Sequence, residues 1–171
     1  MEVDVLEKEK NANKTHMNLM QLTIITGLVA GILGSLIGFF AHTFKFTDIN
    51  PDLILAPFQG EWKEGWLGIV IATLLYGIIS IVVALLYYFT LRKQKSIIWG
   101  AVFGAVNFLL LYFVLYPIIP GLDQIWKYPL LTIVTEVCFF ILYGIFIGYS
   151  ISYEYQEQQY WEKIKLEQQE S

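Results

Sequence analysis

One carboxyl group stands inside an otherwise apolar stretch of the sequence. Glu136 lies in LTIVTEVCFFILYG, residues 131–144, whose other residues are apolar or carry only a hydroxyl or thiol group. A charged side chain at the centre of a bilayer costs roughly 2.5 to 3.5 kcal/mol, so such residues face protein or water rather than lipid. Two kinds of chemistry are open to Glu136: a buried hydrogen bond that fixes the packing of its helix, or the transfer of a proton.

Three further polar residues are candidates to share an intramembrane site with Glu136. Thr132 is one helical turn before Glu136 and Tyr143 is about two turns after it, on the same helical face. Asn107 belongs to a neighbouring apolar run and falls at a comparable depth, ~13 Å from the end of its run against ~9 Å for Glu136. We expect Glu136 to be buried, protonated at neutral pH because burial disfavours the charged form, and hydrogen-bonded to Asn107 or to neighbouring hydroxyl groups.

The usual signatures of catalysis and metal binding are absent from the sequence. It contains no HExxH, no paired CxxC, no phosphate-binding GKS or GKT loop and no GxSxG. His16 and His42 are expected on opposite sides of the membrane, and a single cysteine, Cys138, cannot form an intramolecular disulfide. Since one isolated carboxyl group lacks the partners that an intramembrane hydrolase needs, we expect a non-enzyme without metal or cofactor.

The composition places this chain in lipid rather than in water. Of its 171 residues, 56% are hydrophobic, 16% aromatic and only 15% charged, against about 25% charged residues in soluble domains. A net charge of -4 and the lack of a basic cluster exclude nucleic-acid binding. The partner that the composition predicts is the lipid bilayer.

Four apolar runs are each close to the ~20 residues that cross the hydrocarbon core as a helix. The predicted fold is an all-α integral membrane four-helix bundle, residues 20–153, and Pro117 and Pro129 mark the end of the third helix and the start of the fourth. Residues 1–19 are expected to be a disordered tail and residues 154–171 a helical tail. The predicted helices cover about residues 20–41, 66–91, 97–116 and 130–153.

The distribution of positive charge predicts the orientation, because loops rich in lysine and arginine stay in the cytoplasm. With four spans, both tails and the loop after the second helix share one side, and they carry eight of the 11 basic residues. We therefore expect a multi-pass protein with both termini in the cytoplasm. The three remaining basic residues, on the predicted outer side, are Lys45, Lys63 and Lys127.

Glycine pairs spaced four residues apart occur in two of the predicted helices. This spacing lets helix backbones approach closely. The pairs predict packing inside the four-helix unit, with self-association of two copies into a homo-oligomer as the alternative. The residues are Gly27, Gly31, Gly34 and Gly38 in the first helix and Gly100 and Gly104 in the third.

Three stretches together resemble a known family. FFAHTFKFTDINPDLILAPFQGEWKEGWLG (39–68), YPIIPGL (116–122) and ILYGIFIGYSISYEY (141–155) are similar to YqhR, a family of small conserved membrane proteins from Bacillus and its relatives. The resemblance covers most of residues 20–155 and not the tails. It implies a four-span protein of the bacterial plasma membrane, and it carries no catalytic residues and no established biochemical role.

Two functions are compatible with these features. The first is a non-catalytic scaffold or partner that docks onto another membrane protein, in which Glu136 fixes the packing of helices. The alternative is an oligomer that conducts protons or small solutes along a path lined by Glu136, Asn107 and nearby hydroxyl groups. The exchange of Glu136 for glutamine separates them, because glutamine keeps the shape and hydrogen bonding but exchanges no proton.

Overall fold

The structure, a computed structural model, describes residues 18–58, 65–94 and 96–170. Within these ranges the chain forms helices and turns and no strand, which confirms the all-α prediction. Most of the tail predicted to be disordered, residues 1–17, lies outside the described residues. The first described helix already begins at Leu19.

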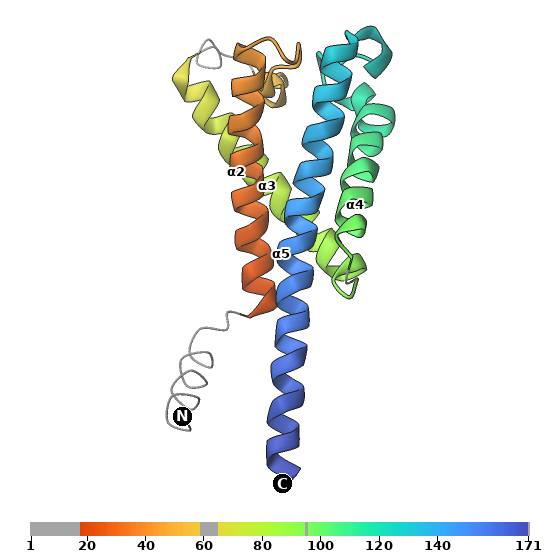
Figure 1. Cartoon of the computed structure of the whole chain (residues 1–171). Helices are drawn as coiled ribbons and strands as arrows, with labels where there is room; N and C mark the ends of the chain where they lie inside the picture. Colours follow the sequence, from red (N-terminus) through yellow and green to blue (C-terminus); the bar gives the residue numbers. More distant parts are fainter. Residues whose placement is uncertain (1–17, 59–64, 95, 171) are drawn as a thin grey trace.

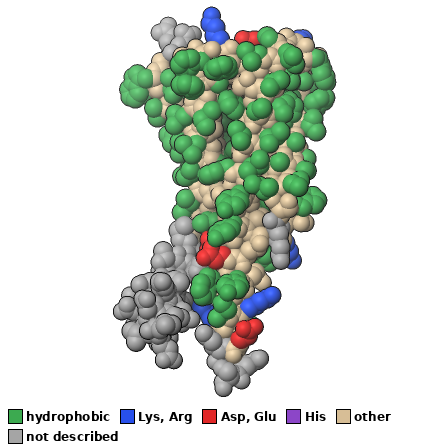
Figure 2. All heavy atoms as spheres, in the orientation of Figure 1, with side chains coloured by type: hydrophobic (Ala, Val, Ile, Leu, Met, Phe, Trp, Pro, Cys, Tyr) green, Lys and Arg blue, Asp and Glu red, His purple; other side chains and the backbone are tan. Residues whose placement is uncertain are grey.

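Four helices in the described ranges are long and apolar enough to cross a membrane, as predicted. They are α2 (Leu19–Thr43), α3 (Trp66–Leu91), α4 (Ile97–Leu109) with its continuation, and α5 (Leu130–Glu170). Hydrophobic side chains cover most of the bundle face seen in Figure 2, and the charged side chains visible there gather towards its two ends. A band of this kind matches the hydrocarbon core between two polar boundaries.

The third span changes its helical geometry part-way along. α4 ends at Leu109 and continues as the π-helical segment η3 (Leu110–Leu115) and the short 3-10 turn η4 (Tyr116–Ile118). The sequence predicted one uninterrupted helix over residues 97–116. Pro117 explains the end of the helix, since it has no N–H to donate, while the wider π-helical turns come before it.

The four spans form two helical hairpins that meet along α5. α2 packs on α3, α4 packs on α5, and α5 also contacts α2 and α3. Figure 1 shows that α2 begins, and α5 leaves the bundle, at the same end. We call this the terminal end. The opposite end, the loop end, carries the connections between α2 and α3 and between η4 and α5, including η1 (Pro51–Leu55) and η5 (Ile125–Lys127).

Glycines bring the helices of each hairpin into backbone contact. A Cβ atom added to Gly27 would lie 2.8 Å from the Cα atom of Ile81 on α3, and one added to Gly31 would lie 2.7 Å from the Cα atom of Gly77. On the other hairpin, a Cβ atom on Gly100 would lie 2.8 Å from the carbonyl oxygen of Gly144 on α5. These positions have no room for a side chain, in keeping with packing inside the unit.

The remaining predicted packing glycines differ from one another. Gly104 is closest to α5, where an added Cβ atom would overlap the carbonyl oxygen of Phe140, and Gly38 faces the ring of Pro51 in η1. Gly34 has open space, with nothing within 4 Å of an added Cβ atom. Packing inside the unit is thus wrong for Gly34, because this glycine is on an exposed side of α2, while the next residue, Ser35, faces α3 with its Oγ 3.2 Å from Thr73 Oγ1. Self-association at Gly34 stays a prediction.

Two clusters of buried side chains fill the bundle. One contains Tyr87 of α3 and Ile147 and Ile151 of α5. The other lies towards the loop end, where Phe108 and Tyr112 of the third span meet Leu122 and Ile125 of the connection to α5. Ile49 and Leu53 from the α2–α3 connection pack on this second cluster, so the loops belong to the core rather than to the solvent.

α5 is much longer than a single span. It runs without interruption from Leu130 to Glu170, 41 residues, whereas the predicted membrane helix ends near residue 153. Figure 1 shows its last part extending beyond the other helices. We call residues 156–170 the α5 arm; at 1.5 Å per residue it is ~22 Å long.

Candidate functional site

The Glu136 carboxyl group is bound by two hydroxyl groups from different parts of the chain. The Thr47 Oγ1 hydroxyl donates to Oε1 at 2.8 Å, and the Tyr112 hydroxyl donates to Oε2 at 3.0 Å. Glu136 lies six residues into α5, ~9 Å from its start. Both carboxyl oxygens are therefore engaged within the protein at a depth where lipid would offer no hydrogen bond.

Thr47 belongs to a segment that runs alongside the first turns of α5. The Thr135 hydroxyl donates to the Phe46 carbonyl oxygen at 3.0 Å, and the Asp48 N–H donates to the Thr132 hydroxyl at 3.1 Å. Together with the Thr47–Glu136 bond, three consecutive residues of the segment bind three side chains of one α5 face. We call residues 46–48 the strap.

The end of α2 directs the chain into the strap. The Phe46 N–H donates to the Ala41 carbonyl oxygen at 2.9 Å and the Lys45 N–H to the His42 carbonyl oxygen at 3.0 Å, the two bonds of a Schellman motif. Lys45 takes the left-handed conformation, with φ of 59°, that this motif requires. His42 then donates from Nδ1 to the Thr47 carbonyl oxygen at 3.2 Å, which ties the strap back to α2.

Thr47 uses its hydroxyl group twice. Besides donating to Glu136, its Oγ1 accepts the N–H of Ile49 at 3.2 Å, and the residue is only 2% exposed. A threonine hydroxyl has one proton to give and lone pairs to accept with, so these two bonds use its donor and one acceptor position. The middle residue of the strap is therefore buried with its hydroxyl group paired.

Tyr112 reaches Glu136 from the π-helical part of the third span. Its ring is 2% exposed and packs against the rings of Phe108 and Phe140, with centroids 4.8 Å and 6.3 Å away. π-helical turns are rare and often accompany functional positions, because they rotate a side chain relative to a regular helix. In this bundle the π-helical segment η3 contains the tyrosine that contacts the intramembrane carboxyl group.

Two more ionisable side chains belong to the surroundings of Glu136. The Tyr76 hydroxyl of α3 lies within electrostatic range of the carboxyl groups of both Glu136 and Asp52. Asp52 is in η1, where its Oδ2 accepts from Asn50 Nδ2 at 2.7 Å. The site thus draws on α3, η1, η3, the strap and α5, so it exists only when both hairpins and the loops are assembled.

The structure separates the residues that the sequence grouped around Glu136. Thr132 joins the site through the strap, but the Asn107 Nδ2 amide donates to the Phe103 carbonyl oxygen on its own helix, at 2.8 Å. The expected Asn107–Glu136 bond is therefore wrong, and the alternative of neighbouring hydroxyl groups holds. Tyr143 is used elsewhere, because its hydroxyl bonds Ser80 Oγ of α3 at 2.7 Å.

Sequence reasoning missed both residues that bind Glu136. Tyr112 could have been found by depth, since it lies four residues from the predicted end of the third helix at residue 116 and Glu136 lies six from the start of the fourth. The sequence gives no such indication for Thr47, because counting residues along a helix cannot give the depth of a residue in an irregular connection. Its position depends on the turn at Lys45 and on the bonds of the strap to α5.

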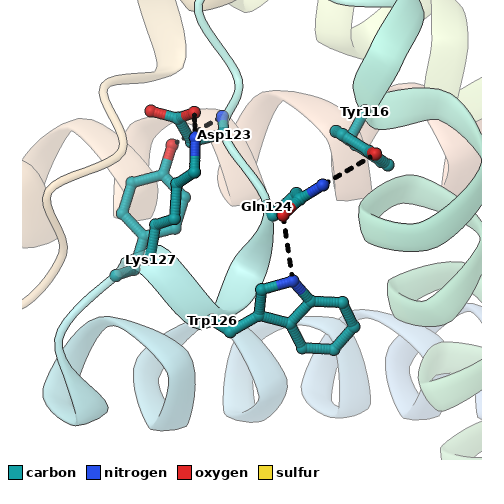
Figure 3. Close-up of polar contacts among 6 residues, drawn as sticks. Tyr116, Asp123, Gln124, Trp126 and Lys127 are labelled. Atoms are coloured by element: carbon teal, nitrogen blue, oxygen red, sulfur yellow. Dashed lines mark hydrogen bonds and ion pairs between the residues drawn. The ribbon is translucent and has the colours of Figure 1, made fainter.

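The connection between η4 and α5 has a separate polar network (Figure 3). Gln124 Nε2 donates to the Tyr116 hydroxyl at 3.1 Å, and its Oε1 accepts from Trp126 Nε1 at 3.2 Å. Lys127 Nζ lies 2.7 Å from Asp123 Oδ1, and this hydrogen bond raises the pKa of Lys127 above its ordinary value. The network orders an exposed loop with a tryptophan at its surface, as at a membrane–water boundary.

The arrangement around Glu136 can hold helices together and can hold or exchange a proton. Within residues 18–58, 65–94 and 96–170, no three His, Cys, Asp or Glu side chains are close enough to hold a metal ion. The contacts of Glu136 are hydroxyl groups, which donate well to a carboxylate.

A model of one protein family, described as conserved membrane protein YqhR, matches residues 4–166. The chain belongs to the YqhR family. A relative in this family, the uncharacterized protein YqhR of Bacillus subtilis (strain 168), is 40% identical over 152 residues, which are 88% of this chain and 85% of the relative. No solved structure matches the chain. Membership confirms the resemblance seen in the sequence and agrees with a small protein embedded in the membrane.

Proposed function

We propose that this YqhR family member is a non-catalytic scaffold of the bacterial plasma membrane that binds another membrane protein through the α5 arm. The observation that carries the proposal is the continuity of α5, which passes from the bundle into the arm as one helix of 41 residues. Tyr160 and Leu166 of the arm are 62% and 61% exposed. Exposed large side chains on a rigid helix are typical anchors for a protein partner.

The charge of the arm indicates which partner surface would fit. The arm carries four glutamates against Lys163 and Lys165. A partner helix or loop with basic residues beside an apolar strip would complement it, and both tails are predicted to be on the cytoplasmic side, where membrane proteins concentrate lysine and arginine. The glutamates of the arm are Glu157, Glu162, Glu167 and Glu170.

The arm is also held at a defined angle to the bundle. The Arg92 guanidinium group lies 4.5 Å from the ring centre of Tyr88 on α3 and 5.5 Å from that of Tyr155 on α5. This double contact braces α5 against the α3–α4 connection just before the arm begins. A partner would therefore meet a preorganised helix, which lowers the entropic cost of binding.

Site-specific photocrosslinking in native membranes tests the scaffold proposal. A photoreactive residue at Tyr160 or Leu166 is expected to give a discrete adduct with one other membrane protein. Leu74, 53% exposed on the membrane-spanning part of α3, is the matched control and should give none. A chain ending at Tyr155 should keep its thermal stability and fail to copurify with the captured protein. Equal adducts from the arm and from Leu74, or copurification without the arm, would contradict the proposal.

Proton conduction is the second candidate, because the Glu136 carboxyl group is hydrogen-bonded to a second ionisable side chain, Tyr112, within the membrane span, and Tyr76 lies within electrostatic range of it. Tyrosine and glutamate side chains can exchange a proton along hydrogen bonds. If this candidate is right, purified protein in liposomes should carry a proton flux that Glu136→Gln abolishes while Tyr143→Phe leaves it intact. Flux that is absent from wild type, or unchanged in Glu136→Gln, would exclude it.

A further inference from the structure

The hydrogen bonds of the strap depend on the protonation state of Glu136. The two carboxyl oxygens accept from Thr47 and Tyr112 at the same time. Only the ionised carboxylate can do this with both oxygens, because it carries no proton of its own. When the carboxyl group binds a proton, one oxygen becomes a donor and the hydroxyl group facing it loses its acceptor. Protonation therefore reverses one of the two bonds and leaves the proton of that hydroxyl group without an acceptor.

Thr47 is poorly placed to compensate for that loss. Its Oγ1 already accepts the Ile49 N–H, and its carbonyl oxygen already accepts from His42. If Glu136 donated to it, the threonine proton would need a new acceptor, and at 2% exposure no bulk water reaches the side chain. A proton on Oε1 therefore leaves the Thr47 proton without an acceptor and weakens the central bond of the strap, whereas a proton on Oε2 leaves the Tyr112 proton, also 2% exposed, without one.

We propose that Glu136 is a proton-controlled latch, which as a carboxylate holds the strap on α5 and which on protonation releases it. The two outer bonds of the strap, to Thr132 and Thr135, involve no ionisable group and weaken only when the central bond is lost. Release would free the α2–α3 connection from α5 at the loop end, and the hairpins would stay together through their packing closer to the terminal end. If the loop end lies outside, as the charge distribution predicts, the latch responds to external pH.

Other titratable groups face the site, and the test has to separate them from Glu136. His42 bonds the strap itself, Asp48 lies within the strap with its side chain exposed, and Asp52 and Tyr76 approach from η1 and α3. Tyr112 contacts Glu136 from η3, and Tyr128, which follows η5, lies within electrostatic range of Tyr112.

A distance measurement between two nitroxide labels follows the strap directly. The labels are placed at Asp48→Cys and Tyr149→Cys in a Cys138→Ala background, because both residues are exposed. Asp48 is bonded to Thr132, which lies ~25 Å along α5 from Tyr149. Double electron–electron resonance in lipid nanodiscs is compared from about pH 8 to about pH 4, a range in which protein carboxyl groups titrate. The fraction of molecules with a displaced strap is expected to rise about fivefold at the low pH, the effect of losing one hydrogen bond.

Three variants assign the response. Glu136→Gln, which cannot ionise, should show the displaced fraction at both pH values, and so should Thr47→Val, which keeps the carboxyl group. Tyr143→Phe is the matched control, because it removes a hydroxyl bond of the same kind, to Ser80, away from the strap. It should keep the wild-type response.

The proposal is overturned by any of three results. They are a wild-type distance distribution that does not change with pH, a Glu136→Gln protein that keeps the pH response, or a Thr47→Val protein as ordered as wild type at high pH. If Glu136→Gln failed to fold, the Thr47→Val result alone would decide, since it leaves Glu136 in place.

Discussion

The middle and the loop end of this bundle are held together by different means. In the middle, α4 and α5 meet through glycines, and Gly104 lies against the Phe140 carbonyl oxygen with no space for a side chain. At the loop end, α5 meets the strap through side-chain hydrogen bonds that join residues 84 to 89 positions apart. A helix that packs on another helix needs small residues, whereas a helix that packs on an irregular segment must satisfy the polar backbone of that segment.

The glycine contacts of the middle and the hydrogen bonds of the loop end should tolerate substitution to different degrees. A glycine contact fails by steric overlap, which no neighbouring group can relieve without moving a whole helix. A hydrogen-bonded contact fails by leaving polar groups unpaired, which costs less and depends on protonation. The middle is therefore expected to be the rigid part of the molecule and the loop end the adjustable part.

Thiol labelling of a cysteine at the loop end should give the largest effect, because the cysteine reacts fully or not at all. The result shows on which side of the membrane the loop end lies. Asp123→Cys, in a Cys138→Ala background, is expected to react with a membrane-impermeant thiol reagent added outside intact cells, because Asp123 is exposed at the loop end. A cytoplasmic reporter fused after Glu154 should be active. Labelling only after the membrane is opened would reverse the orientation that the positive charges predict.

Glycine substitutions should produce the largest loss of stability. Gly104→Ile and Gly31→Ile are each expected to lower the free energy of unfolding by about 3 kcal/mol, the upper range for overpacking, because both glycines touch the backbone of the partner helix. Gly34→Ile is the matched control, with nothing within 4 Å, and should change stability by less than about 0.5 kcal/mol. Thermal unfolding in detergent measures the stability of the three variants and of wild type.

Gly34→Ile also tests the remaining role of that glycine. If two copies associate through the open position at Gly34, the variant should reduce the oligomer in native mass spectrometry without changing the stability of the monomer. An unchanged oligomer size would remove Gly34 from any interface. A large loss of monomer stability would instead show that Gly34 packs inside the bundle.

Substitution of Glu136 should have a smaller effect than the glycine substitutions. Glu136→Leu is expected to lower the free energy of unfolding by about 1 to 2 kcal/mol, because Thr47 and Tyr112 lose their acceptor. Glu136→Gln keeps one acceptor oxygen and should lose about half as much. A leucine variant as stable as wild type would show that the loop end does not depend on these bonds.

Much of the middle of the bundle could be predicted from the sequence, and little of the loop end. The apolar runs and the pairs such as Gly100 and Gly104 follow from the length of a span and from helical spacing, both of which are local. The bond from Thr47 to Glu136 depends on a left-handed Lys45 and on a π-helical third span. Neither has a local signal: lysine is an unusual residue in that conformation, and LLYFVL is as apolar as a regular helix.

The smallest expected change concerns the turn that leads into the strap. Lys45→Gly should raise the free energy of unfolding by about 0.5 to 1 kcal/mol, because glycine adopts the left-handed conformation without the Cβ clash that lysine bears. Chemical unfolding followed by tryptophan fluorescence measures the change, with Lys45→Ala as a control that removes the side chain and keeps the Cβ atom. A loss of stability would mean that the Lys45 side chain has a role of its own.

A double-mutant cycle on Thr47 and Glu136 tests the central claim, that the strap is bound to α5 through this pair. The free energies of unfolding of wild type, Thr47→Val, Glu136→Leu and the double variant are compared at neutral pH. A direct bond predicts that the double variant loses about 0.5 to 1.5 kcal/mol less than the sum of the single losses. Losses that add to within about 0.3 kcal/mol would show that the two residues are not coupled, and the account of the loop end would be wrong.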